Sequence, residues 1–146
     1  MIITICSSAS FYRQAVDVQA ELERAGYTVI IPENAELMKQ RNDFEVTHYK
    51  TWFEDAKDYH KKATLMRHHF QEVKKADAIL VLNYEKHGVP NYIGGNVLME
   101  MSLAFYLNKP IYVLNEIPEE SSFLEEIVGL GSIPLHGKIE NLPAAS

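Results

Sequence analysis

The feature that most constrains the fold is a repeating order of short apolar runs and helical patterns, which starts at the first residues. Residues 2–6, "IITIC", are a β-branched run, and apolar residues then recur at spacings of three and four from Ala15 to Ala25, as expected of a helix. Gly26 ends this pattern, and "YTVII" is a second apolar run. Because parallel strands are joined by a crossing helix, residues 2–32 predict a β-α-β unit.

The middle of the chain continues this alternation. The stretch from Glu33 to His87 contains neither glycine nor proline, and its apolar residues keep a helical spacing from Val46 to Val73. This spacing predicts one long helix or two abutting helices. The next run, "AILVLN" at residues 78–83, is almost wholly apolar, which is typical of a central parallel strand that is covered on both faces.

The last third of the chain completes the pattern. A helix is predicted from about Asn96 to Leu107, with Asn96 after two glycines as a favourable N-cap. "IYVLN" predicts a further strand, and a short helix around 123–128 and a weak strand around 133–135 follow. We therefore expect an α/β fold with a single doubly wound, mainly parallel sheet of about five strands, flavodoxin-like or Rossmann-like, flanked by helices.

Composition narrows the class of protein. A length of 146 residues, with 47% hydrophobic and 23% charged residues, predicts one domain over residues 1–146. No apolar run approaches the ~20 residues of a membrane span, no signal peptide is evident, and a single cysteine, Cys6, cannot form an internal disulfide. We expect a cytoplasmic protein without a membrane partner.

The charge of the chain argues against a nucleic-acid partner. The formal net charge is -6 and the pI is about 5.5, whereas a nucleic-acid-binding domain usually carries a basic stripe. Most lysines and arginines lie between Lys39 and Lys75, where they alternate with acids. A solvated helical face is the simplest interpretation of that mixture.

In doubly wound sheets, ligands bind beyond the carboxyl ends of the strands. The loop after the first strand, "SSASFY", offers the hydroxyls of Ser7, Ser8 and Ser10, which could hold a phosphate or a sugar hydroxyl, or could simply cap a helix. The loop lacks both the glycines of a dinucleotide fingerprint and the lysine of a P-loop. No cofactor is therefore expected.

Glu100 is the candidate catalytic residue. It is the one carboxylate in the apolar stretch that follows Gly94 and Gly95, and it shares a helical face with Val97 and Ala104. One interpretation is an acid that the helix dipole favours near the helix start. The other is a nucleophile, which the same dipole would keep ionised at neutral pH.

The stretch "EMSLAFYLNKPIYVL", preceded by a "GGN" turn and by "KKADAILVLN", resembles the nucleoside 2-deoxyribosyltransferase family. In that family, a glycine turn leads to a nucleophilic Glu inside a helix, with small residues two and four positions later and a Lys-Pro before the next strand. Matched in this way, Glu100 falls on the nucleophile, Ser102 and Ala104 fall on the small residues, and Lys109-Pro110 falls on the Lys-Pro.

The resemblance also implies a set of substrate-binding residues. The first loop is similar to the family's substrate loop, and Asp77 before the third strand has a family counterpart. The family usually has a Gly-Thr or Gly-Ser near the Glu and an Asp before it, whereas this chain has "NYIGGNVLME". The implied substrate-binding residues are Ser7, Ser8, Ser10, Phe11, Tyr12, Asp77, Asn91, Tyr92, Gly94, Gly95 and Asn96.

The implied activity is cleavage or transfer at the N-glycosidic bond of a nucleoside or nucleoside monophosphate. Glu100 would form a covalent glycosyl-enzyme intermediate, which water or a second base would resolve. Tyr12 or Tyr92 could position the carboxylate. Family members assemble as oligomers, and the apolar face from Val46 to Val73 would suit a homodimer.

Two other functions stay open. A cytokinin-activating phosphoribohydrolase also has a double glycine before a Glu, but its motif contains a Gly-Thr and its Glu lies one residue further on. A nucleotide-sensing domain without turnover is favoured by the missing Gly-Thr and opposed by Glu100 in its apolar setting.

No metal site is expected from the sequence. His68 and His69 are adjacent on a predicted helix, so their side chains point about 100° apart and cannot chelate one ion together. Cys6 ends the first strand near the expected pocket, but the sequence shows no basic neighbour that would activate its thiol. Trp52 and Phe53 are interpreted as packing residues in preference to a base-stacking platform.

Overall fold

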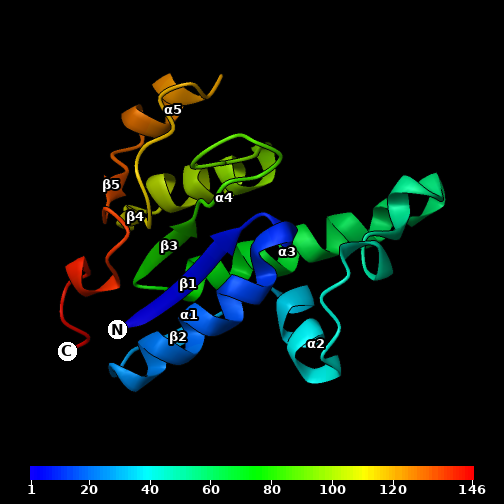
Figure 1. Cartoon of the computed structure of the whole chain (residues 1–146), viewed down its shortest axis with the longest axis horizontal. Coiled ribbons are helices and arrows are strands. Elements are labelled where there is room, and N and C mark those ends of the chain that lie inside the picture. Colours follow the sequence, from blue (N-terminus) through cyan, green and yellow to red (C-terminus); the bar gives the residue numbers. More distant parts are fainter.

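A computed structural model describes residues 1–146 as a five-stranded parallel sheet in the order β2-β1-β3-β4-β5 (Figure 1). This is the doubly wound order in which the winding direction changes between β1 and β3. The expected fold class is confirmed. The strands and α-helices are β1 (Ile2–Ser7), α1 (Tyr12–Arg24), β2 (Thr28–Ile30), α2 (Glu33–Arg41), α3 (Tyr59–Lys75), β3 (Ala78–Leu82), α4 (Gly95–Tyr106), β4 (Ile111–Val113), α5 (Leu124–Gly129) and β5 (Ile133–Pro134).

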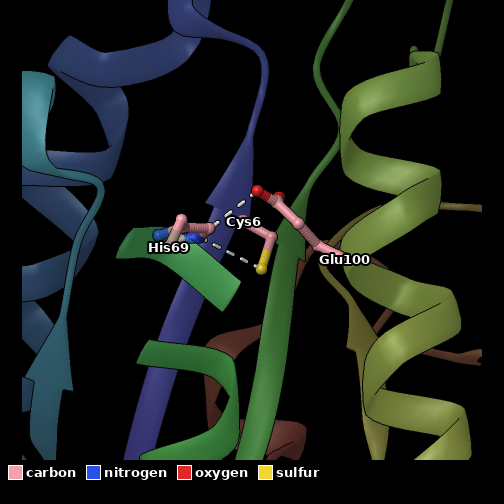
Figure 2. A group of neighbouring side chains, drawn as sticks. All are labelled: Cys6, His69 and Glu100. Carbon is pink, nitrogen blue, oxygen red and sulfur yellow. Dashed lines mark hydrogen bonds and ion pairs between the residues drawn. The ribbon is translucent and has the colours of Figure 1, made fainter. Parts of the chain in front are cut away.

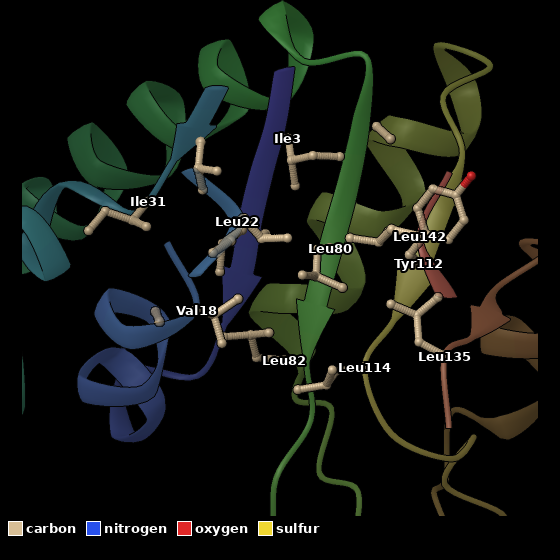
Figure 3. Packing of buried hydrophobic residues seen from close by; sticks show 14 of the residues in the cluster. Ile3, Val18, Leu22, Ile31, Leu80, Leu82, Tyr112, Leu114, Leu135 and Leu142 are labelled. Carbon is tan, nitrogen blue, oxygen red and sulfur yellow. The ribbon is translucent and has the colours of Figure 1, made fainter. Parts of the chain in front are cut away.

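Two hydrophobic clusters lie on opposite faces of the sheet, because successive side chains of a strand point to opposite faces. Ile3 and Ile5 of β1 belong to the cluster beneath α1 and the C-terminal segment (Figure 3). Cys6 belongs to the other cluster, beneath α3, α4 and α5. Both faces of β3 are covered, with Leu80 in the first cluster and Val81 in the second, which explains its wholly apolar sequence.

The segment between α2 and α3 differs from the sequence prediction. Asn42 adopts a left-handed conformation with φ of 50° and ends α2. Three short 3-10 helices follow, at Val46–His48, Thr51–Phe53 and Ala56–Asp58. The predicted long helix, or pair of abutting helices, is therefore wrong over residues 42–58. Acidic side chains start two of these turns, since Glu45 and Asp55 accept hydrogen bonds from backbone amides two residues later.

The start of α4 also differs from the prediction. Gly94, not Asn96, is the N-cap, and the helix begins at Gly95 without a side-chain cap. A Cβ atom on Gly94 would lie 2.9 Å from the hydroxyl oxygen of Tyr92. The glycine therefore allows the Tyr92 ring to lie against the first turn of α4, and the Asn96 side chain is left free.

The chain ends lie close together, as Figure 1 shows. The amino group of Met1 donates a hydrogen bond of 2.8 Å to the carbonyl of Ala145. None of the helices combines the length and the apolar character that a membrane crossing requires.

Candidate active site

A cavity of about 170 Å³ lies beyond the carboxyl ends of β1 and β3, where the winding of the sheet changes direction. The loops after β1 and β3, the start of α4 and the inner face of α3 line it. Lys50 and Trp52, from the 3-10 segment before α3, contribute to a further part of the wall. The cavity is therefore at the position where doubly wound sheets bind ligands.

Most of the residues singled out from the sequence meet at this cavity. The predicted site residues that line it are Ser7, Ser8, Tyr12, Tyr92, Gly94, Gly95, Asn96 and Glu100. They come from only two stretches of the chain, residues 7–12 between the end of β1 and the start of α1, and residues 92–100, which run into the second turn of α4. These two stretches are adjacent because β1 and β3 are neighbours in the sheet.

Four predicted residues lie elsewhere. Ser10 lines a separate shallow hollow beside Arg13, and Phe11 is buried with its ring edge-to-face against Tyr84. Asn91 lines a neighbouring groove formed with residues 116–123.

Asp77 is the fourth, and its assignment to the substrate site needs correction. It directly precedes β3 and therefore lies at the amino end of the strand, opposite the cavity. Its carboxylate accepts a hydrogen bond of 2.7 Å from the backbone amide of Ile2. This bond ties the start of β1 to the start of β3, which is a structural role.

Glu100 points into the protein and lines the cavity with only 4% of its surface exposed. Burial raises its pKa from 4.5 to about 8, although Cys6 and the positive charge of Lys62 oppose this shift. The expectation that the helix dipole keeps Glu100 ionised is therefore wrong. α4 begins at Gly95, so Glu100 lies in its second turn, and the dipole acts mainly within the first.

Glu100 belongs to a buried cluster with Cys6 and His69 (Figure 2). The Nε2 atom of His69 lies 3.6 Å from the Sγ atom of Cys6 and 3.7 Å from a carboxylate oxygen of Glu100. Burial raises the pKa of the Cys6 thiol well above its ordinary value and lowers the pKa of His69 to about 4. Near pH 7, Cys6 and His69 are therefore uncharged, and Glu100 is mainly protonated.

His69 is the basic neighbour of Cys6 that sequence reasoning missed. It precedes the buried Val73 by four residues on α3, and residues at this spacing share a helix face. That spacing is the signal that it points inward. Because His69 is neutral, it does not stabilise a Cys6 thiolate by charge.

Three lysines line the cavity as well, and the sequence interpretation placed two of them on a solvated surface. Lys86 donates a hydrogen bond of 2.9 Å to the hydroxyl of Ser8. Lys62 lies over the ring of Trp52 at 5.5 Å. Burial lowers the pKa of Lys50, and the charges of Lys62 and Lys86 lower it further, as expected where like charges surround one space.

The two aromatic residues before α3 have different roles. Trp52 is buried and lines the cavity, whereas Phe53 is 73% exposed. The interpretation of both as packing residues is thus wrong for Phe53. Trp52 offers an aromatic wall to a bound ligand.

Comparison with known proteins adds no family assignment. Neither the protein-family models nor the curated proteins contain a match to this sequence. The fold and the cavity together define a doubly wound α/β protein with a candidate site at its switch point.

Proposed function

We propose that this protein cleaves or transfers at the N-glycosidic bond of a nucleoside or nucleoside monophosphate, with Glu100 as the nucleophile. The observation that carries the proposal is the position of Glu100, a buried carboxyl group that faces the cavity at the switch point of the sheet. The sequence resemblance to nucleoside 2-deoxyribosyltransferases assigns the nucleophile to the same residue.

The proposed reaction has two steps. An oxygen of the ionised Glu100 attacks C1′ of the sugar, the C1′–N bond breaks with its electron pair going to the base, and the base takes up a proton. Water or a second base then attacks C1′ and gives up a proton to solvent, while the bond from C1′ to Glu100 breaks and its electron pair returns to the carboxylate. The first acceptor makes the protein a hydrolase and the second makes it a transferase.

The reaction needs Glu100 without its proton. Its pKa of about 8 leaves a minor fraction ionised near pH 7. Positive charge develops on the sugar in an oxocarbenium-like transition state and favours the ionised form of Glu100. The carboxylate therefore contributes more electrostatic stabilisation in the transition state than in the free enzyme. His69, with a pKa of about 4, does not retain the proton, which therefore passes to solvent.

The lysines favour a nucleoside monophosphate among the possible substrates. Lys50, Lys62 and Lys86 line the same cavity, and so do the first residues of α4, a helix that has no side-chain cap. Three ammonium groups against one lining carboxylate, Glu33, together with a helix start, suit a phosphate. A neutral nucleoside would leave these charges without a partner, so the 5′-phosphate is the part of the substrate that the lysines would bind.

A non-catalytic nucleotide-binding domain is the second candidate, and the raised pKa of Glu100 favours it. A protonated carboxyl group donates and accepts hydrogen bonds but is a poor nucleophile. In this alternative, Glu100 would bind a sugar hydroxyl or a base edge, and the lysines would still bind the phosphate.

Base release separates the two candidates. Purified protein is incubated with a panel of nucleosides and their 5′-monophosphates, and free base is quantified by chromatography. We expect release by the native protein, none by Glu100→Gln, and unchanged release by Glu120→Gln, a control in an exposed loop. Nucleotide binding without base release from any substrate would contradict the glycosidase and support the binding domain.

A further inference from the structure

We propose that Cys6, His69 and Glu100 form a binding site for zinc or a similar thiophilic divalent metal ion. The three side chains come from β1, α3 and α4 and converge on one point (Figure 2). They supply one sulfur, one imidazole nitrogen and one carboxylate oxygen, the donor types that zinc prefers. This inference does not depend on the proposed glycosidase activity.

The spacing of the donor atoms suits a tetrahedral ion. With Zn–S of about 2.3 Å and Zn–N of about 2.0–2.1 Å, tetrahedral angles hold sulfur and nitrogen roughly 3.5 Å apart. The Sγ atom of Cys6 lies 3.6 Å from Nε2 of His69, and that nitrogen lies 3.7 Å from a Glu100 oxygen. All three donor atoms lie within 4.8 Å of one another. Only small side-chain movements are therefore needed.

The imidazole of His69 is buried, and its Nε2 atom faces both Cys6 and Glu100. The ring is 7% exposed, and its Nδ1 atom is buried without a hydrogen-bond partner. A metal ion on Nε2 would place the ring proton on Nδ1 and define a single state.

The charge balance is also favourable for a buried site. On metal binding, Cys6 and Glu100 each lose a proton, so one thiolate and one carboxylate neutralise the two positive charges of the ion. His69 binds as a neutral base. Because Glu100 and His69 line the cavity, the fourth coordination position is accessible to water from that side, as in zinc sites with an open position.

The lysines of the cavity oppose an incoming cation. Lys50, Lys62 and Lys86 carry the same sign of charge as the ion, whereas Glu33 also lines the cavity and partly offsets them. Binding requires the loss of two protons in addition. Affinity should therefore increase steeply with pH, by up to about one hundredfold for each unit of pH below the thiol and carboxyl pKa values.

A metal ion at this site would weaken the attack of Glu100 on a sugar, because coordination withdraws electron density from the carboxylate and holds it at the ion. The site thus predicts inhibition by zinc if the protein is a glycosidase. If the protein only binds nucleotides, the metal site is retained, with its open position facing the ligand.

The experiment is titration of reduced, chelator-treated protein with Co²⁺ under argon, followed by displacement with Zn²⁺. We expect about one equivalent of Co²⁺ to give thiolate-to-metal absorption in the near ultraviolet and the intense visible bands of tetrahedral coordination. Zn²⁺ should abolish both and release about two protons per ion relative to the apoprotein in a weakly buffered solution.

Variants locate the ion. Cys6→Ser, His69→Gln and Glu100→Gln should each weaken Zn²⁺ binding by at least about tenfold, measured against a chromophoric chelator. His68→Gln is the matched control, because His68 is adjacent in sequence but exposed and paired with Glu33 and Glu72. Circular dichroism checks that each variant is folded.

A measurement on the native protein avoids reliance on folded variants. X-ray absorption of the zinc-loaded protein should give one sulfur at about 2.3 Å with nitrogen and oxygen neighbours at about 2.0–2.1 Å. The proposal is overturned if no ion binds at micromolar concentration, if the sulfur is missing, or if His68→Gln removes binding and Cys6→Ser does not. Base release is measured separately, so an inert protein that binds zinc would contradict only the proposed activity.

Discussion

The ammonium group of Lys86 donates a hydrogen bond of 2.9 Å to the hydroxyl of Ser8, and this bond joins the loop after β3 to the loop after β1. The Lys86 ammonium also lies 4.9 Å from the ring centre of Tyr92. Ser8 in turn accepts a hydrogen bond from the amide of Ser10 and caps the turn before α1. A single lysine thus links both loops of the switch point beside the cavity.

Lys86→Met should raise the KM for a nucleoside monophosphate by about tenfold or more, since a charge-assisted hydrogen bond is worth about 1.5–3 kcal/mol. The KM for the matching nucleoside should change less, because that substrate has no phosphate and loses only the effect of the Lys86–Ser8 bond on the loops. Steady-state base release with both substrates measures the difference, with Lys74→Met on the exposed side of α3 as the control. Equal losses on both substrates would contradict a phosphate-binding role for Lys86.

Base release should depend on pH through the ionisation of Glu100. Only the carboxylate attacks the sugar, and burial raises the pKa of Glu100 to about 8. We expect kcat/KM of chelator-treated protein to rise about tenfold per pH unit below that pKa and to level off above it. Lys62→Met should move the midpoint upward, because the positive charge of Lys62 lowers the pKa of Glu100. A profile that is flat between pH 6 and pH 9 would exclude Glu100 as the titrating nucleophile.

The same pKa makes a prediction about stability. The folded protein holds the Glu100 proton up to a pKa of about 8, whereas the unfolded chain releases it near the ordinary value of 4.5. At Glu100 the folded state therefore binds more protons between these values, and the contribution of this residue to stability falls as pH rises through the range.

Glu100→Gln should remove that dependence. Denaturant unfolding should show the variant to be more stable than the native protein at pH 9, by a few kcal/mol, and the difference should shrink toward pH 5. Glu120→Gln, in an exposed loop, should leave the pH dependence unchanged. Stability that rises with pH in the native protein relative to Glu100→Gln would contradict the buried, protonated state.

The sheet was predictable because its signals are local. The apolar runs at β1 and β3 and the helical spacing of α1 each extend over a few residues, and the connecting lengths then favour a parallel sheet. The segment at 42–58 was not predictable in the same way. This segment contains neither glycine nor proline, the residues that usually signal the end of a helix. The preceding helix, α2, ends at Asn42, a residue type that adopts the left-handed conformation only in some contexts.

The candidate site was predictable only in part, for a related reason. Glu100 follows Gly94 and Gly95 within one short stretch of sequence, so a local motif reveals all three residues. His69 meets Cys6 across 63 positions of sequence, and its partner depends on how α3 lies over the sheet. The sequence position of Val73 indicates which face of α3 points inward. It does not indicate that Cys6 of β1 lies beneath that face. The raised pKa of Glu100 likewise arises from burial by surrounding elements.

The expected homodimer stays a prediction, and Phe53 offers a way to test it. Phe53 is 73% exposed next to the buried Trp52, in the segment that precedes α3. If copies of the chain associate through this region, Phe53→Asp should convert a dimer into a monomer in light scattering at micromolar concentration. Phe105→Asp, on the exposed side of α4, is the control. A native protein that is monomeric under these conditions would contradict the dimer.

Gly94 and Gly95 provide a matched pair for the role of Tyr92. A Cβ atom on Gly94 would lie 2.9 Å from the Tyr92 hydroxyl, whereas nothing lies within 4 Å of the corresponding atom on Gly95. Gly94→Ala should therefore displace Tyr92 from the cavity and weaken nucleotide binding by about tenfold or more, as expected from misplacing one binding group. Gly95→Ala should retain binding and raise stability by up to about 1 kcal/mol, because alanine has the higher helix propensity. Calorimetric titration with a nucleoside monophosphate and thermal unfolding measure both effects. Equal binding by the two variants would show that the ring of Tyr92 does not contact the ligand.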